Sequence, residues 1–207
     1  QHRCGAVHPA QAGRLSMAPL RIRRRTLLGA GAQALSLGLL GLHDASAQPE
    51  VPLEIRNGVS SARLAGTARM RFFGLNIYDA RLWVAPGFQA SAFALHPLAL
   101  ELTYLRALNG RSIAERSLKE MQRTAPLTTE VAQRWLGLMQ DAFPDVVEGD
   151  RLTGLHRPGT GAQFWLNGQP RATIPEAEFS RRFFGIWLSE DTSEPRLRTE
   201  LLAGNTP

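Results

Sequence analysis

The chain has 207 residues, 43% hydrophobic and 20% charged, which is enough for one folded domain with its own core. Six of its 24 basic residues but only one of its 18 acidic residues precede Gln48, so the overall charge of +6 falls to +1 for the remainder. This balance argues against a nucleic-acid-binding protein, and the single cysteine, Cys4, argues against a disulfide-rich domain.

The N-terminal part has the three regions of a secretory signal peptide. Arginines at positions 21 and 23–25 precede an apolar run over residues 27–42, and the small-residue motif Ala45-Ser46-Ala47 follows. The apolar run is short and rich in glycine, so we expect cleavage before Gln48 and no stable membrane span afterwards. The adjacent arginines 24 and 25 also fit a twin-arginine signal, so the Tat and Sec export routes both stay open.

This leader predicts how the chain is divided. Met17 is a natural start, so residues 1–16 are expected to be an upstream extension and residues 17–47 a signal peptide. Residues 48–207 are then the folded domain, which we expect in the periplasm. The sequence makes no prediction of the oligomeric state.

Alternating patterns predict the first strands. We interpret residues 53–56 as a short strand that ends at the turn Asn57-Gly58. In residues 64–72 apolar side chains alternate with polar ones, which predicts a half-buried strand. Gly74 interrupts this pattern as a bulge or a turn would, and the alternation resumes over residues 78–84 and again over 98–104.

Two helices are predicted next. Ser112 and Glu115 have the spacing of a capping box, which indicates a helix over residues 113–123. Residues 129–143 carry an apolar face and end at Pro144, which predicts the second helix.

The chain then returns to strands before two last helices. Strands are predicted over residues 150–156, 162–166 and 171–174, and Asn167-Gly168 between the last two is a hairpin turn signal. Pro175 is expected to open a helix with an aromatic face, and a short helix begins near Ser193. This order predicts an α+β fold in which helices cover one face of an antiparallel sheet.

Few residues after the leader suggest chemistry. His96 and His156 stand 60 positions apart without an acid at ligand spacing, so we expect no metal site, and the absence of cofactor motifs predicts no cofactor. Tyr78 and Tyr104 fall on the apolar side of their strands. They are either core tyrosines bonded to the backbone or hydroxyl groups that face a ligand cleft beside a guanidinium. Arg69 is the candidate guanidinium, but its strand parity directs it to solvent unless a bulge turns it inward.

From residue 64 to residue 204 the chain resembles the exported bacterial branch of the chalcone isomerase-like superfamily. The resemblance implies an open-faced β-sandwich with an apolar cleft between a large antiparallel sheet and its helices. The matching pieces are Ala65-Gly66-Thr67-Ala68-Arg69, the apolar stretch to Ile77-Tyr78 and Leu82-Trp83, the segment LALELTYLRALNGRSIAERSLKEM, and the closing FFGIWLSEDTSEPRLRTELLAG.

This resemblance implies two kinds of function. Plant members cyclise chalcones to flavanones, an intramolecular lyase reaction in which an arginine steadies the phenolate and carbonyl oxygens. A tyrosine, an asparagine and threonines complete that cleft. Related members are non-catalytic and hold fatty acids, with the arginine on the carboxylate.

By the same resemblance, Arg69 matches the family arginine. Ile113 falls at the catalytic tyrosine, Glu120 at the asparagine, Tyr78 at a threonine, and Arg198 near a late threonine. Cyclisation needs polar groups that stabilise an enolate, which Ile113 cannot supply. Holding an acid needs one charge-assisted contact and an apolar cleft.

We therefore expect a periplasmic, non-catalytic protein that binds a small amphipathic or fatty-acid-like ligand. An intramolecular lyase with Arg69 as its catalytic residue is the alternative. A third hypothesis is a partner-binding module that uses an aromatic helix face, made of Phe183, Phe184 and Trp187. The expected ligand-binding residues are Arg69, Tyr78, Tyr104, Ile113 and Glu120.

Overall fold

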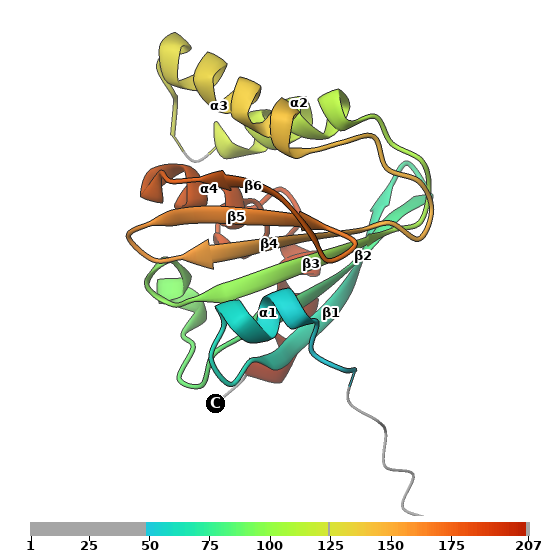
Figure 1. Cartoon of the computed structure of the whole chain (residues 1–207), viewed down its shortest axis with the longest axis vertical. Helices are drawn as coiled ribbons and strands as arrows, with labels where there is room; N and C mark the ends of the chain where they lie inside the picture. The colour runs from blue at the N-terminus through green and yellow to red at the C-terminus, as the bar shows by residue number, and fades with distance from the viewer. Residues whose placement is uncertain (1–48, 124, 206–207) are drawn as a thin grey trace, which may run out of the picture. The chain divides into compact units, whose positions relative to one another are not determined.

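The computed structural model describes residues 49–123 and 125–205 (Figure 1). The predicted upstream extension and signal peptide lie outside these residues. The described part is an α+β unit built on a single antiparallel sheet.

Six strands pair in chain order to form the sheet, each antiparallel to its neighbour. The alternating segments of the sequence become these strands, so the predicted antiparallel sheet is confirmed. The strands are β1 (Arg63–Phe72), β2 (Leu75–Val84), β3 (Leu98–Tyr104), β4 (Arg151–Arg157), β5 (Gly161–Leu166) and β6 (Gln169–Ile174).

Two tight turns of the same geometry connect β1 to β2 and β5 to β6. Asn167 and Gly168 have φ angles of 51° and 79°, as a two-residue hairpin turn requires, which confirms the predicted hairpin. Phe73 and Gly74 have φ angles of 47° and 78°. Gly74 therefore interrupts the alternation because the chain turns back there into a second strand.

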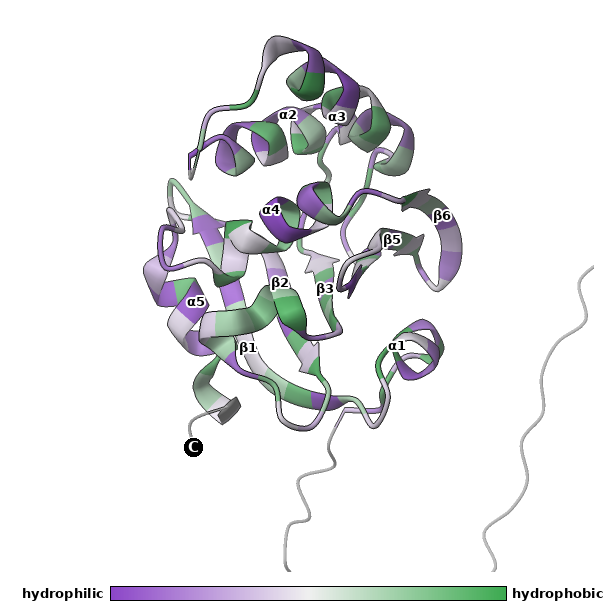
Figure 2. Ribbon diagram, turned by 90° about the vertical axis from the view of Figure 1, so that its left-hand side faces the viewer, coloured by the Kyte–Doolittle hydropathy of each residue, from purple (hydrophilic) through white to green (hydrophobic). Residues whose placement is uncertain are grey.

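Four helices cover one face of the sheet, as predicted: α2 (Gly110–Met121), α3 (Thr129–Ala142), α4 (Ala177–Leu188) and α5 (Pro195–Leu201). Helix α4 packs on β4 and β5, and α5 packs on β1 and β2. Helices α2 and α3 pack against each other, α2 also contacts α4, and α3 contacts β6 (Figure 2). The 3-10 helices are η1 (Ala90–Leu95) and η2 (Ala203–Asn205).

The core lies between the sheet and these helices. Phe164 of β5 meets Phe179 and Phe183 of α4 at ring-centroid distances of 6.5 and 5.2 Å. Phe183, Phe184 and Trp187 are all buried in this core. The hypothesis of a partner-binding aromatic face is therefore wrong, because that face packs against the protein's own sheet.

Residues 53–58 form a helix, α1 (Leu53–Gly58), where we expected a short strand. The helix lies on the opposite face of the sheet, where Ile55 and Val59 pack with Trp83 and Leu155. Four alternating residues satisfy either geometry, and it is contact with this apolar patch that selects the helix.

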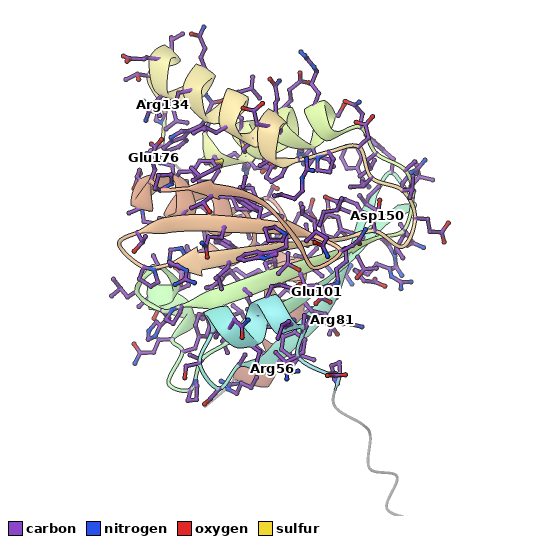
Figure 3. The ribbon with its side chains drawn as sticks, viewed as in Figure 1. Arg56, Arg81, Glu101, Arg134, Asp150 and Glu176 are labelled. Carbon is purple, nitrogen blue, oxygen red and sulfur yellow. The ribbon has the colours of Figure 1, made fainter. Side chains whose placement is uncertain are left out.

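The structure also moves the predicted starts of two helices. Helix α2 begins three residues earlier, because the Asn109 side chain accepts a hydrogen bond from the backbone NH of Ser112. The predicted capping box is therefore wrong. Helix α4 begins after Glu176, so Pro175 lies just outside it. Glu176 instead accepts hydrogen bonds from Arg134 and the Trp135 indole of α3 (Figure 3).

Candidate functional site

A cavity of about 380 Å³ lies between the helix-facing side of the sheet and helices α2 and α4. Most of its lining side chains are apolar. They are Met70, Phe72, Ile77, Tyr78, Leu102, Tyr104, Leu108, Ser112, Ile113, Arg116, Ser117, Glu120, Phe143, Leu152, Phe183, Ile186, Trp187, Ser193 and Glu194.

Strand register brings the sheet residues of the cavity together. Tyr78 of β2 lies opposite Tyr104 of β3, and Leu102 lies opposite Leu152 of β4. Paired residues point to the same face of a sheet, so all four side chains face the helices. Above them, α2 contributes residues spaced three and four apart, which share one face of a helix.

Two tyrosines supply polar groups inside this apolar surface. The Tyr78 hydroxyl accepts a hydrogen bond of 3.0 Å from the Trp187 indole, and the two tyrosine rings meet edge to face at 6.1 Å. Tyr104 is 2% exposed, and its hydroxyl has no hydrogen-bond partner among the described residues. Each phenol hydroxyl can therefore donate a hydrogen bond to a bound molecule.

Burial keeps both phenols in their neutral form. It raises the pKa of Tyr78 to about 12, an effect that the hydrogen bond from Trp187 partly offsets. It also raises the pKa of Tyr104, with the neighbouring Tyr78 adding to the effect. At neutral pH these side chains are hydrogen-bond donors and not bases.

One charged side chain, Arg116, lies at the opening of the cavity, next to the largely buried Glu120. We call Phe72, Ser112 and Arg116 the cavity mouth, because these three lining residues are exposed. The Arg116 guanidinium lies 5.3 Å from the centre of the Phe72 ring and 2.9 Å from the Glu120 carboxylate. Glu120 is also 3.6 Å from Arg123, so two cations share one acid there.

Arg69 lies outside this cavity, on the other face of the sheet. It pairs in register with Asp79, and its guanidinium donates hydrogen bonds of 2.6 and 2.7 Å to the Asp79 carboxylate, which raises the pKa of Arg69. Strand β1 has an irregularity between Leu64 and Gly66, but Arg69 still has the parity of an outward residue. No bulge turns Arg69 inward, so it points to the face that its strand parity predicts.

Gly66 gives the small-residue run a different role. A Cβ atom at Gly66 would collide with the backbone carbonyl oxygens of Glu200 and Leu201. Gly66 thus lets helix α5 pack closely on β1.

Four of the five predicted ligand-binding residues line the cavity: Tyr78, Tyr104, Ile113 and Glu120. Arg198 lies elsewhere and donates a hydrogen bond to the Leu188 carbonyl. Sequence reasoning missed Arg116, which stands three residues after Ile113 and four before Glu120. That spacing places it on their helix face and was a usable signal.

His156 has a structural position. It is buried in β4, with Nδ1 2.6 Å from the Ser180 hydroxyl of α4 and Nε2 3.0 Å from the Ala94 carbonyl of η1. Burial lowers its pKa. Within the described ranges, no group of three or more His, Cys, Asp and Glu residues could hold a metal ion.

No helix of the described residues is long and apolar enough to cross a membrane. The leader's apolar run is not among these residues.

The sequence of this chain is similar to that of known proteins. Residues 46–203 match the model of a family described as chalcone isomerase-like. A Haemophilus influenzae protein named "uncharacterized protein" is 33% identical over 106 residues, which are 51% of this chain and 52% of that protein. The chain thus spans about half the length of this curated relative.

A solved structure shares the fold. The crystal structure of a fatty-acid binding protein from Arabidopsis thaliana superposes with a TM-score of 0.54 over 69% of this chain and 87% of that chain. The two sequences are 15% identical, so this likeness concerns the arrangement of the sheet and helices.

Proposed function

The chain belongs to the chalcone isomerase-like family, and we propose that it is a non-catalytic member that binds a small amphipathic molecule, a fatty acid or a similar acid with an apolar tail. The observation that carries this proposal is an apolar cavity with neutral phenols inside and a guanidinium at its mouth. Its volume of about 380 Å³ lies within the range of small-molecule pockets, about 300–1,000 Å³.

The chemistry of the lining sets the orientation of such a ligand. The tail lies against Leu102, Leu152 and Phe183, where each buried methylene contributes about 0.8 kcal/mol. A carboxylate deep in this cavity would lose its hydration without meeting a cation, so the acid group lies at the mouth. Among the described residues, Arg116 is the arginine that lines the cavity, and it takes the role first assigned to Arg69.

The ion pairs around Glu120 make Arg116 available to a ligand. Arg116 can turn toward an incoming carboxylate while Glu120 keeps Arg123 as a partner. A charge-assisted contact of this kind contributes about 1.5–3 kcal/mol. The Arabidopsis protein of the same fold is named for fatty-acid binding, which supports the choice of ligand class.

A fluorescent fatty acid tests the proposal. We expect cis-parinaric acid to bind the wild-type protein, and Arg116→Gln to weaken that binding at least about tenfold. Binding of the parinaric acid methyl ester, which has no charge, should hardly change in this variant. Arg111→Gln is the matched control, because Arg111 is an exposed arginine of the same helix that does not line the cavity.

Two outcomes would contradict this proposal. One is a wild-type protein that is empty by native mass spectrometry and binds neither the acid nor the ester. The other is an acid affinity that falls in Arg69→Ala and not in Arg116→Gln, which would return the anion site to Arg69.

The intramolecular lyase remains a second candidate because two tyrosine hydroxyls and an arginine line one apolar cavity. The raised pKa of both phenols disfavours them as bases at neutral pH, and the guanidinium lies at the mouth. The test is the loss of chalcone absorbance with purified protein. A rate equal to that of buffer removes this candidate.

Export to the periplasm is part of the proposal. It is supported by the arginine cluster, the apolar run and the Ala45-Ser46-Ala47 motif of the leader. Fractionation of cells that express the full chain should find the protein in the periplasm with its N-terminus at Gln48. The double change Arg24→Lys with Arg25→Lys should block a Tat route and leave a Sec route intact.

A further inference from the structure

The turn between β1 and β2 carries a cluster of exposed apolar side chains, which we call the hairpin tip: Phe72, Phe73 and Leu75. These side chains are 42%, 89% and 51% exposed. They are three of the six strongly exposed large hydrophobic residues of the described chain, and the other three are far apart in sequence. Single exposed apolar residues are ordinary, whereas a contiguous cluster marks an interaction site.

The backbone holds this cluster outward at a cost in stability. Phe73 has a φ angle of 47°, in the left-handed region that costs a non-glycine residue about 1 kcal/mol or more. The equivalent position of the β5–β6 turn is Asn167, a residue suited to that conformation. One turn thus has the residue that its geometry favours, and the other has a phenylalanine in nearly full contact with water.

The hairpin tip adjoins the cavity mouth. Phe72 belongs to both, and its ring contacts the Phe73 ring at a centroid distance of 4.5 Å. Figure 1 shows this turn at the same end of the sheet as the segment that leads into α2.

Guanidinium groups flank the tip. Arg116 lies over the Phe72 ring, and the exposed side chain of Arg71 precedes Phe72 on β1. Arg71 donates a hydrogen bond to the uncharged Asn76 side chain, so its charge is not cancelled by that contact. An apolar tip with cations beside it complements a surface that is apolar within and anionic outside.

We propose that the hairpin tip docks on a lipid bilayer with anionic headgroups and holds the cavity mouth against it. Phe73 and Leu75 enter the interface between headgroups and acyl chains, and Arg71 meets lipid phosphates. The entry of a ligand into the cavity beside the hairpin tip rests on the proposed function. The docking itself does not depend on it.

The shape of the tip favours a bilayer over a protein partner. A specific protein interface buries about 800 Å² on each partner and needs complementary surfaces. Three side chains on a two-residue turn form a narrow projection, which inserts into a deformable interface without shape matching. A tail could then pass from the bilayer to the cavity past Phe72 without crossing water.

Flotation with vesicles of phosphatidylethanolamine and phosphatidylglycerol tests the docking. The processed protein is used, with the same N-terminus verified by mass spectrometry in every preparation. We expect Phe73→Ser with Leu75→Ser to reduce vesicle binding at least about tenfold. The matched control is Leu95→Ser with Val147→Ser, which removes two exposed apolar side chains elsewhere and should leave binding unchanged. Vesicles of phosphatidylcholine alone should bind the wild-type protein more weakly.

Further measurements separate this inference from the proposed function. In the absence of vesicles, the tip variant should keep its wild-type circular dichroism and its affinity for cis-parinaric acid. A wild-type protein that binds vesicles but does not bind parinaric acid would overturn the proposed function and leave the docking intact. Equal vesicle binding by the tip and control variants overturns the docking. A wild-type dimer that the tip substitutions dissociate also overturns it, because the tip would then bind a second copy.

Discussion

Individual side chains of the cavity owe their chemical state to their surroundings. Burial raises the pKa of Tyr78 and Tyr104, and the largely buried Glu120 carboxylate pairs with two arginines. Arg69 shows the opposite case, since its pair with Asp79 lies on the exposed outer face. A residue type alone therefore does not identify a site.

The tyrosines offer a direct test of burial, since the chain contains only two. An ordinary tyrosine is half ionised near pH 10, whereas burial raises the pKa of Tyr78 to about 12 and raises that of Tyr104 as well. We expect almost no phenolate absorbance from the folded protein at pH 10. The same solution in urea should show about half of both phenols ionised.

The same shift predicts a loss of stability at high pH. A folded pKa above the unfolded value means that the stabilising contribution is complete below about pH 10 and is lost as the pH rises toward about 12. Urea midpoints measured across this range should fall. Half-ionised tyrosines in the folded protein at pH 10 would contradict both expectations.

Helix α1 is held to the outer face of the sheet by an ion cluster. Arg151 of β4 donates hydrogen bonds to Glu54 of α1 and to Glu101 of β3, and Thr153 donates one to Glu54. Glu101 is 1% exposed and also accepts a 3.0 Å hydrogen bond from Arg81. Figure 3 shows Arg81 and Glu101 beside this helix.

Removing the central cation should destabilise the protein. Arg151→Ala leaves two buried carboxylates short of a partner, and breaking a buried pair in this way costs about 3–5 kcal/mol. Arg157→Ala, an exposed arginine of the same strand, is the control and should change stability little. Urea denaturation measures both. Equal losses in the two variants would show that the cluster does not hold α1.

Helix α4 is joined to β4 through His156 and Ser180. Burial lowers the pKa of His156, so its neutral form is favoured in the folded protein. The stabilising contribution is therefore present above the unfolded pKa of about 6.5 and is lost as the pH falls through the lower folded value. When the pH is lowered below about 6, we expect the urea concentration at the unfolding midpoint to decrease. The decrease should be smaller in His156→Gln.

His96 provides the control for this pH dependence. His96→Gln should retain the wild-type response, because His156 is still present. An unchanged response in His156→Gln would assign the acid sensitivity to other groups.

At the scale of the whole molecule, the cavity lies where the sheet and the helix layer meet. The sheet supplies the tyrosines and α2 supplies Ile113, Arg116 and Glu120, so a ligand that bridges the layers should stabilise the fold. At a ligand concentration one hundred times the dissociation constant, the expected gain is about 2.7 kcal/mol.

A cavity-filling variant tests this coupling. We expect cis-parinaric acid to raise the melting temperature of the wild-type protein by several degrees. It should leave the melting temperature of Ile113→Trp unchanged, because the indole occupies the space of the ligand tail. Ala107→Ser, an exposed change outside the cavity, is the control and should respond as the wild type does. Equal shifts in all three proteins would place the ligand elsewhere.

Most of the architecture follows from local patterns in the sequence. Alternation with a period of two marks the strands, and Asn167-Gly168 marks a hairpin because few other residues accept its φ angles. The same alternation places Tyr78 and Tyr104 on the buried side. The family resemblance, now shown, led from there to Ile113 and Glu120.

Tertiary structure decided what alternation leaves open. Which residue pairs with Arg69 depends on the register of β1 with β2, which places Asp79 opposite it. Which arginine meets the ligand space depends on how α2 lies over the sheet, which selects Arg116. Residues 53–58 become a helix only against Trp83 and Leu155. Local propensity acts over a few residues, whereas each of these outcomes depends on contacts between distant segments of the chain.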